Sequence, residues 1–234
     1  MKKQGIDSHR RRVLQAGALL AGCTYLPAWA VDRMATPAQM RGPFYPLTLP
    51  LDQDNDLVSV SARSGIAHGI ITNITGQVLD EQGRAQAGVR VEIWQVNGYG
   101  RYHHAGDDSD RPIDPNFQGY GTALTGADGA YRFRTIKPLA YPGRAPHIHF
   151  ALTRKDFGTF STQMYVAGAA ENERDFLLSG IRDRKARASL IVALEPSSAF
   201  AGELAGEFPI VLAADGRLKR GALPEAYRQA GLGL

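Results

Sequence analysis

The sequence has very little cysteine and no apolar run long enough to span a membrane. Cys23 is the only cysteine among 234 residues, so no internal disulfide can form. The same scarcity excludes a zinc site built from several thiolates. Because 44% of the residues are hydrophobic, the chain can bury a sizeable core. We therefore expect one domain, stabilised by that core or by a metal ion.

Beyond the first thirty residues, the sequence also lacks an excess of positive charge. The whole chain carries 27 basic and 23 acidic residues, but residues 1–30 hold five of the basic residues and one of the acidic ones, which leaves 22 of each. A basic surface for nucleic acid is therefore not indicated, and we expect no nucleic-acid partner.

Residues 1–30 have the parts of an export signal. A positive start is followed by an apolar run from Val13 to Cys23, which is too short to span a bilayer, and then by small residues. The pair Arg10-Arg11 is typical of a twin-arginine signal. We expect export to the bacterial periplasm or attachment to the membrane as a lipoprotein; the alternative is a disordered basic tail.

Two cleavage sites are compatible with this leader. The segment Leu20-Ala21-Gly22-Cys23 resembles a lipobox, in which Cys23 would carry a lipid anchor. Ala28-Trp29-Ala30 fits an ordinary signal-peptidase site equally well. The sequence leaves both open.

The rest of the chain divides into an arm and a β-rich domain. Residues 31–67 are rich in Pro, Asp and Ser, and we expect them to form a long N-terminal arm that buries Phe44, Tyr45, Leu47 and Leu49. Residues 68–234 contain strand-like runs at 68–80, 88–96, 130–136, 146–154, 161–168, 189–195 and 206–213. Helices are expected only at 169–183 and 224–231. The pattern predicts an all-β fold, an antiparallel β-sandwich with few short helices.

His147 and His149 are the first candidates for chemistry. In an extended strand, residues i and i+2 point to the same face, so both imidazoles would be directed at one place. They could bind Zn, Cu, Fe or Ni, or they could be an exposed pair on a solvated face. Further donors in the sequence are three other histidines and a group of acids: His68, His103, His104, Asp107, Asp108 and Asp110.

Two tyrosines could complete such a site. Tyr141 precedes His147 across a Pro-Gly turn, and Tyr102 follows an apolar strand in a loop that could reach over the end of the sheet. Tyrosine is more often a core or rim residue, but a tyrosinate is a hard anionic ligand that favours Fe(III).

Several ordered motifs resemble one enzyme family. The runs GPFYP, WQVNGYGRYHH, DPNFQGYGTALTGADGAYRFRTIKPLAYPGRAPHIHF and STQMYV, within about residues 40–195, resemble the catalytic core of the intradiol ring-cleavage dioxygenases, the protocatechuate 3,4-dioxygenase and catechol 1,2-dioxygenase group. The resemblance implies a non-haem Fe(III) cofactor bound by Tyr102, Tyr141, His147 and His149. It also implies that a catechol-type ring, protocatechuate-like or catechol-like, is cleaved by O2 to a cis,cis-muconate.

The resemblance assigns further roles. Tyr141 would also act as a base that leaves the metal, Arg144 would stabilise negative charge on the ring, and Gln163 would line the site. An oligomer is implied, either of identical chains or with a related subunit. Gly143 replaces a large aromatic residue of the protocatechuate enzymes, which predicts a reshaped pocket wall.

Two other functions remain compatible with the residues. The segment ITGQVLDEQGRAQAGVRVEIWQV resembles prealbumin-like sandwiches that act as non-catalytic binding modules. A periplasmic copper or zinc protein could use His103, His104, His147 and His149.

Overall fold

The computed structural model describes residues 33–50, 52–156 and 158–213. The elements, in chain order, are β1 (Ile71–Asp80), β2 (Arg90–Trp94), β3 (Tyr120–Leu124), β4 (Ala130–Ile136), β5 (His147–Arg154), β6 (Gly158–Val166), the 3-10 helix η1 (Ala170–Glu173), α1 (Phe176–Ser179), α2 (Arg184–Ala188), β7 (Ile191–Val192), β8 (Glu195–Pro196), β9 (Leu204–Glu207) and β10 (Ile210–Leu212).

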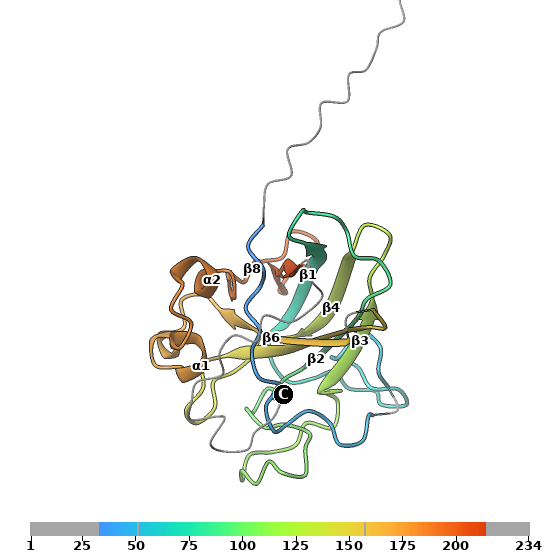
Figure 1. The fold of residues 1–234 in the computed structure, drawn as a ribbon. Helices are drawn as coiled ribbons and strands as arrows, with labels where there is room; N and C mark the ends of the chain where they lie inside the picture. Colours follow the sequence, from blue (N-terminus) through green and yellow to red (C-terminus); the bar gives the residue numbers. More distant parts are fainter. Residues whose placement is uncertain (1–32, 51, 157, 214–234) are drawn as a thin grey trace, which may run out of the picture.

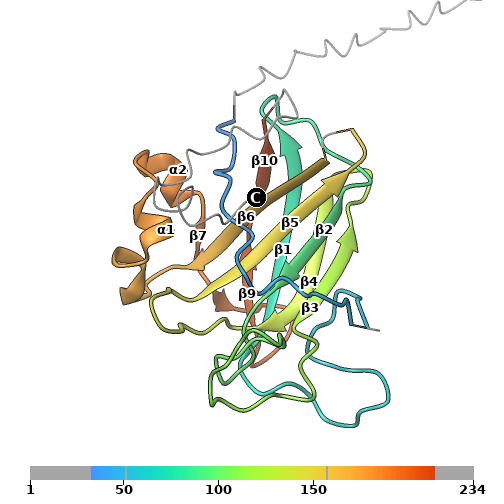
Figure 2. The same ribbon diagram turned by 60° about the horizontal axis from the view of Figure 1, so that its bottom comes forward.

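The strands form two sheets packed face to face (Figures 1 and 2). One sheet has the order β3-β2-β5-β6-β7. In the other, β4 pairs with one side of β1, while β9 and β10 pair with successive halves of its other side. The predicted all-β sandwich is confirmed, although β1 runs parallel to β9 and β10, and β6 runs parallel to β7.

The core lies between the two sheets. On β5, Ile148, Phe150 and Leu152 point into it and are fully buried, as are Val91 and Ile93 on β2. The alternate residues of these strands occupy the opposite face, which a two-layer sandwich would leave to solvent. Here that face is buried too, because the arm and several loops cover it. The alternation of apolar Val91 and Ile93 with charged Arg90 and Glu92 predicts a half-buried strand, yet Glu92 on the outer face is only 5% exposed.

A short stretch of the arm, residues 53–57, closes one side of the sandwich. Its carbonyl groups accept hydrogen bonds from Thr122 on β3 and Arg134 on β4, which are the outermost strands of the two sheets on this side. The unpaired edge groups of both strands thereby find partners. Close approach is possible because β3 carries Gly121, where a Cβ would lie 2.5 Å from the carbonyl oxygen of Asp54.

The remainder of the arm differs from the expectation in one respect. Phe44 and Tyr45 are partly buried against an aromatic cluster, as expected. Leu47 and Leu49 are exposed, by 82% and 39%, so the prediction that they need burial is wrong. Between residues 33 and 50 the arm crosses the face of β6, where Gln39 donates its backbone N–H to the carbonyl of Ser161 (Figure 2).

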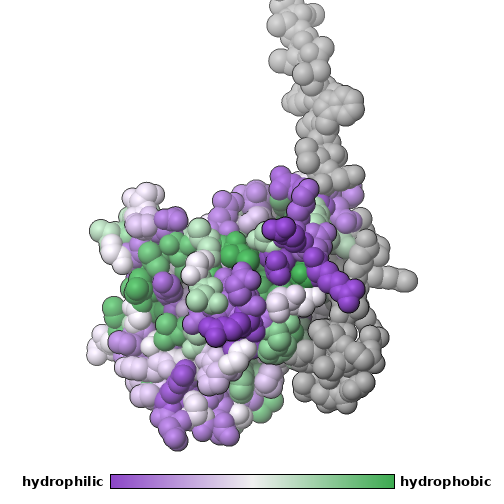
Figure 3. Space-filling model, turned by 90° about the vertical axis from the view of Figure 1, so that its left-hand side faces the viewer, coloured by the Kyte–Doolittle hydropathy of each residue, from purple (hydrophilic) through white to green (hydrophobic). Residues whose placement is uncertain are grey.

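The expected helix at 169–183 is also wrong, because Asp175 divides the segment and Asp183, its last residue, begins a separate helix. Asp175 has an extended backbone, and its side chain accepts hydrogen bonds from the N–H groups of Leu177 and Leu178, so α1 begins there. Asp183 caps α2 in the same way, through Lys185 and Ala186. Side chains of this type compete with helical hydrogen bonding and favour a new start. The face that carries α1 and α2 mixes apolar and charged residues (Figure 3).

Two strand predictions need amendment. Strand β3 was not expected, because Gly121 and Ala123 give its sequence little β propensity; its pairing with β2 over five residues fixes it in place. The run at 189–195 forms only the short strands β7 and β8. The leader at 1–30, including Cys23, and the expected helix at 224–231 lie outside the described residues. In the part of the chain that is described, no helix has the length and apolar character needed to cross a membrane.

The packing of residues 53–57 on β3 can be tested with Gly121→Ala. A Cβ at this position would meet the carbonyl of Asp54 and the Cδ1 atom of Leu57, each at 2.5 Å. We expect the free energy of unfolding to fall by about 1–3 kcal/mol, the usual cost of overpacking. Gly126→Ala is the control, since its Cβ would face only a movable Asp128 carboxylate oxygen, at 3.0 Å. Equal losses for the two variants in urea denaturation would contradict this account.

Candidate metal centre

Four side chains from three segments converge on the outer face of the sheet that contains β5. His147 and His149 lie on β5, with ring centroids 4.8 Å apart. Tyr141 comes from the turn before β5, and its ring centroid is 5.4 Å from that of His147. Tyr102 comes from the loop after β2, and its ring centroid is 6.2 Å from that of His149. The two phenol rings are 5.7 Å apart. Both histidines are only 2% exposed, so an exposed pair on a solvated face is excluded.

Tight turns and carboxylate caps hold the two tyrosines. The stretch Tyr141-Pro142-Gly143-Arg144 folds back on itself: Arg144 donates its N–H to the carbonyl of Tyr141 at 2.9 Å, and Gly143 has a φ of 79°. A positive φ at this place favours glycine. In the other loop, a carboxylate oxygen of Asp107 accepts the backbone N–H of Tyr102 at 2.7 Å.

The Nε2 atoms of the two imidazoles point toward each other. The Nδ1–H of His147 donates to the carbonyl of Ala145 at 2.6 Å, which leaves Nε2 unprotonated and 3.2 Å from Nε2 of His149. Two nitrogens bound at a right angle to one ion, each at about 2.1 Å, lie about 3 Å apart. Burial, followed by the charge of Arg144, lowers the pKa of His147 to about 3. The pKa of His149 is also well below its usual value, mainly because of burial, so neither ring competes for protons near neutral pH.

The phenols complete the donor set. The hydroxyl oxygen of Tyr102 is buried and makes no hydrogen bond of regular geometry among the described residues, with the Tyr141 hydroxyl as its polar neighbour. Burial, with a further contribution from nearby Tyr141, raises the pKa of Tyr102 well above its usual value. Burial also raises the pKa of Tyr141, although the charge of Arg144 opposes it. A bound cation would reverse this balance and stabilise both phenolates. Two neutral imidazoles and two phenols therefore fit a hard cation such as Fe(III).

Arg144 links the donor set to a polar network behind it. Its Nε donates to Asp175 at 2.8 Å, its Nη2 donates to Gln163 at 2.6 Å and to Tyr165 at 3.2 Å, and its Nη1 lies 3.4 Å from the Tyr141 oxygen. Burial disfavours the charge of Arg144, but Tyr165 and Asp175 outweigh this effect and raise its pKa. The guanidinium thus stays charged and fixed beside Tyr141.

Asp175 was not singled out in the sequence, although it anchors this network. Its Oδ2 atom accepts hydrogen bonds from Arg144 and from the backbone N–H of Ala145, while Oδ1 caps α1. The side chain is fully buried. The available sequence signal was an aspartate directly before the apolar run Phe176-Leu177-Leu178, which is typical of a helix N-cap.

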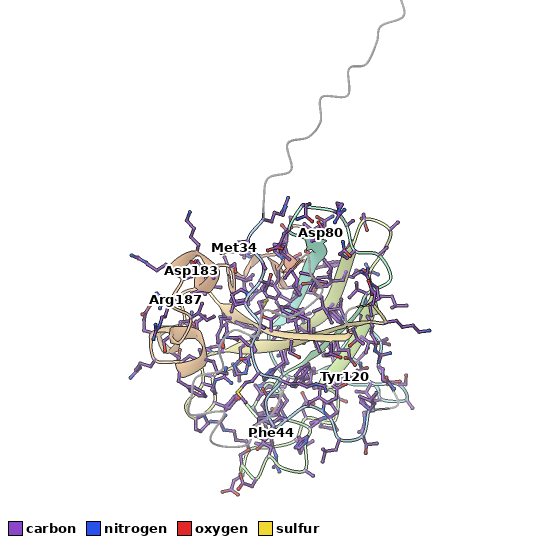
Figure 4. The ribbon with its side chains drawn as sticks, viewed as in Figure 1. Met34, Phe44, Asp80, Tyr120, Asp183 and Arg187 are labelled. Atoms are coloured by element: carbon purple, nitrogen blue, oxygen red, sulfur yellow. The ribbon has the colours of Figure 1, made fainter. Side chains whose placement is uncertain are left out.

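Aromatic residues and the arm seal the centre. The ring of Trp94 stacks on His149 at 4.8 Å with an interplanar angle of 5°, and Phe44 stacks on Tyr102 at 4.6 Å. Gly42 lies against His149, where a Cβ would be 3.3 Å from Cε1. In Figure 4, Phe44 lies among the loops at one end of the molecule, far from Met34 and Asp80 at the other. The arm therefore contributes directly to the site.

The other candidate donors do not join the four. His68 is exposed and stacks on Tyr99, and His104 accepts a hydrogen bond from the backbone N–H of Gly106. Asp107 holds the backbone of Tyr102, whereas His103, Asp108 and Asp110 are exposed. Within the described ranges, no three His, Cys, Asp or Glu side chains come together as a metal site. This finding does not favour the copper or zinc protein that the sequence left open.

The buried ion pair can be tested with Asp175→Asn. Asparagine can still cap α1 but leaves the buried charge of Arg144 without its partner, so we expect a loss of about 3–5 kcal/mol in the free energy of unfolding. Asp183→Asn is the control, because Asp183 caps α2 in the same way but is exposed and forms no ion pair with another described residue (Figure 4). Its cost should be within about 0.5 kcal/mol. Similar unfolding midpoints for the two variants would show that the pair contributes little.

Known proteins resemble this chain in both sequence and structure. The model of the dioxygenase family matches residues 40–214. The beta chain of protocatechuate 3,4-dioxygenase from Burkholderia cepacia is 42% identical over 168 residues, covering 68% of this chain and 71% of that protein. The alpha chain from the same organism is 30% identical over 165 residues, with coverage of 67% and 82%.

Among solved structures, the dioxygenase domain of a dioxygenase carbohydrate-binding protein fusion from the cellulolytic bacterium Streptomyces sp. SirexAA-E has a TM-score of 0.59 and 28% identity, covering 77% of this chain and 99% of that one. The chain spans 36% of a matched hydroxyquinol 1,2-dioxygenase and 50% of a matched catechol 1,2-dioxygenase. With the family model matching most of the chain, and a relative 42% identical, the chain belongs to the intradiol ring-cleavage dioxygenases, a family of oxidoreductases.

Proposed function

We propose that this protein binds non-haem Fe(III) through Tyr102, Tyr141, His147 and His149 and cleaves a catechol-type ring with O2 to a cis,cis-muconate. One observation carries the proposal: two phenols and two neutral imidazoles converge in a buried place, where the Tyr102 hydroxyl makes no hydrogen bond of regular geometry to a described residue and has the Tyr141 phenol beside it. An orphaned buried hydroxyl is costly unless something binds it. Membership of the family supports the same reaction.

Each histidine contributes an uncharged ligand whose orientation is already fixed. The hydrogen bond from His147 to Ala145 fixes one ring, and the stacked Trp94 restrains the other. When bound, Fe(III) would withdraw electron density from the substrate ring and make a ring carbon open to attack by O2. The protein has to hold the ring, accept its protons and exclude bulk water.

Tyr141 is the residue suited to accept a substrate proton. It is half-buried and lines a cavity, whereas Tyr102 is only 3% exposed and packs under Phe44. As a phenolate, Tyr141 would take a proton from a catechol hydroxyl and become the neutral phenol that its raised pKa favours. The Tyr141 oxygen can then move away from the cation at little electrostatic cost.

Arg144 and Gln163 act on charge that builds up on the ring. The guanidinium lies 3.4 Å from the Tyr141 oxygen and is held from behind by Asp175 and Gln163. The Gln163 amide also donates to the carbonyl of Met40, which ties the arm to this network. A cation fixed in advance stabilises developing negative charge without reorganisation. Arg144 is therefore the electrostatic residue of the mechanism, and Gln163 positions it.

Export and assembly complete the proposal. The twin-arginine-like leader supports transport to the periplasm, with or without a lipid anchor at Cys23. Because both an alpha and a beta chain of protocatechuate 3,4-dioxygenase are relatives, we also propose an oligomer, of identical chains or with a related subunit. A non-catalytic binding module is no longer proposed, since the family consists of enzymes.

Tyr141→Phe tests the proposed ligand set. The iron-loaded wild-type protein should absorb visible light through tyrosinate-to-iron charge transfer, and this band should shift when catechol is added. Losing the Tyr141 oxygen should weaken the band and lower kcat for catechol cleavage by about 100-fold or more, because both an anionic ligand and a base are removed. Absorbance, iron content and oxygen uptake are the measurements.

Tyr99→Phe is the matched control. Tyr99 is 40% exposed, lies in the loop that also carries Tyr102, and stacks on His68, with no ring contact to any of the four proposed ligands. This variant should keep the band and the activity of the wild type. A wild-type protein that remains colourless after incubation with ferric or ferrous iron would rule out the proposed function.

A further inference from the structure

A cavity of about 490 Å³ opens beside Tyr141. Three segments line it. They are the turn that holds Tyr141 and Arg144, the loop between β2 and β3, which contributes Arg111, and the segment around η1, which contributes Glu171 and Arg174. A larger cavity, of about 680 Å³, lies among β1, β3 and β4 and contains none of the four proposed ligands. Of the four proposed ligands, only Tyr141 lines the smaller cavity, so this cavity is a space beside the metal centre into which part of a bound substrate can extend.

The cavity is larger than a single aromatic ring requires. A cavity of about 150 Å³ is enough to bind benzene. At Gly143, which lines the wall, a Cβ would meet no atom within 4 Å, so no side chain fills this part of the space. A catechol in contact with Tyr141 would leave room for a substituent several atoms long.

The charges on the wall favour an anion. The charge of Arg144 is largely balanced by Asp175, with which it is paired at 2.8 Å. Arg111 donates to the carbonyl of Gly100, and neither Arg111 nor Arg174 forms an ion pair with another described residue. Glu171 also lines the wall and likewise forms no ion pair within the described part of the chain. Two unpaired guanidiniums and one carboxylate leave a net positive wall.

We propose that this cavity is a specificity subsite for a catechol that carries an anionic side chain, with the carboxylate bound by Arg111 and Arg174. The proposal rests on the proposed function and adds the substrate class to it. The cavity volume favours a carboxylate separated from the ring by two or more carbons over one attached directly to the ring. Arginine suits this role because its planar guanidinium can bind a carboxylate through two hydrogen bonds.

The test compares matched substrates on the iron-loaded full chain. The anionic probe is 3-(3,4-dihydroxyphenyl)propanoate, and its primary amide is the neutral counterpart of nearly equal size. We expect kcat/KM for the acid to exceed that for the amide by about 3- to 10-fold, mostly through KM, as for a partly exposed ion pair. Catechol and 3,4-dihydroxybenzoate complete the series, and the latter should be the poorer of the two acids.

Two variants with opposite expected effects on the acid-to-amide ratio of kcat/KM test which charged residues contact the carboxylate. Arg174 is exposed and no hydrogen bond of its side chain is seen among the described residues, so Arg174→Gln should fold normally and reduce the acid-to-amide ratio about 3- to 10-fold. Glu171→Gln, on the same turn, should raise the ratio by removing a repelling carboxylate. Arg182→Gln is the control, because Arg182 is exposed and does not line the cavity. It should leave the ratio at the wild-type value.

Each outcome has a distinct meaning. Equal use of acid and amide, or a ratio that neither variant changes, overturns the subsite. If kcat/KM for 3,4-dihydroxybenzoate equals kcat/KM for the propanoate, the proposed preference for a longer side chain is wrong. If no catechol is consumed at all, the proposed function fails, and calorimetry with 3-(4-hydroxyphenyl)propanoate and its amide still decides whether the cavity prefers the anion.

Discussion

A buried ion pair between Arg144 and Asp175 holds the site together. Asp175 caps α1, accepts the N–H of Ala145 just before β5 and pairs with the adjacent Arg144, so a single carboxylate connects α1 with the turn that precedes β5. Without its charge, Arg144 would be buried and unpaired beside Tyr141, where the cost of desolvation is high. Helix capping, the approach to β5 and the electrostatics of the proposed metal centre thus depend on the same two oxygens.

Alternate side chains of strand β5 face the hydrophobic core and the candidate site. Its residues Ile148, Phe150 and Leu152 pack into the core between the sheets, and the intervening residues His147 and His149 face the site. The core therefore fixes the direction of both imidazoles. His147, His149 and Tyr102 are nevertheless buried, since Trp94, Phe44 and the arm cover this outer face. A bare sandwich would expose this face to solvent. Because the arm covers it, the face has the low dielectric environment that catalysis by fixed charges needs.

Local sequence patterns predicted the parts of the site that depend on local geometry. The spacing of His147 and His149 on a strand predicted their shared face, whereas the roles of Tyr102, Tyr141, Arg144 and Gln163 came from the resemblance to the dioxygenase family. The contribution of Asp175 could not be found in this way, because its contact with Arg144 joins residues 31 positions apart. The burial of Glu92 was missed for a similar reason: it depends on hydroxyl donors from Tyr45 and Tyr120, which come from other segments.

The charges of the site explain why it should favour a hard cation. Burial keeps both imidazoles neutral and both phenols protonated, while Arg144 is the charge nearest to them and is already paired. The four donor side chains would therefore be stabilised by a positive charge between them, but none of the four carries one. Tyr102 and Tyr141 would lose their phenol protons more readily beside a trivalent ion than beside a divalent one, because the higher charge stabilises the two phenolates more strongly. In the proposed function, Tyr141 would then be a base of high proton affinity beside the cavity, so the burial that raises its pKa would also prepare it to take a proton from the substrate.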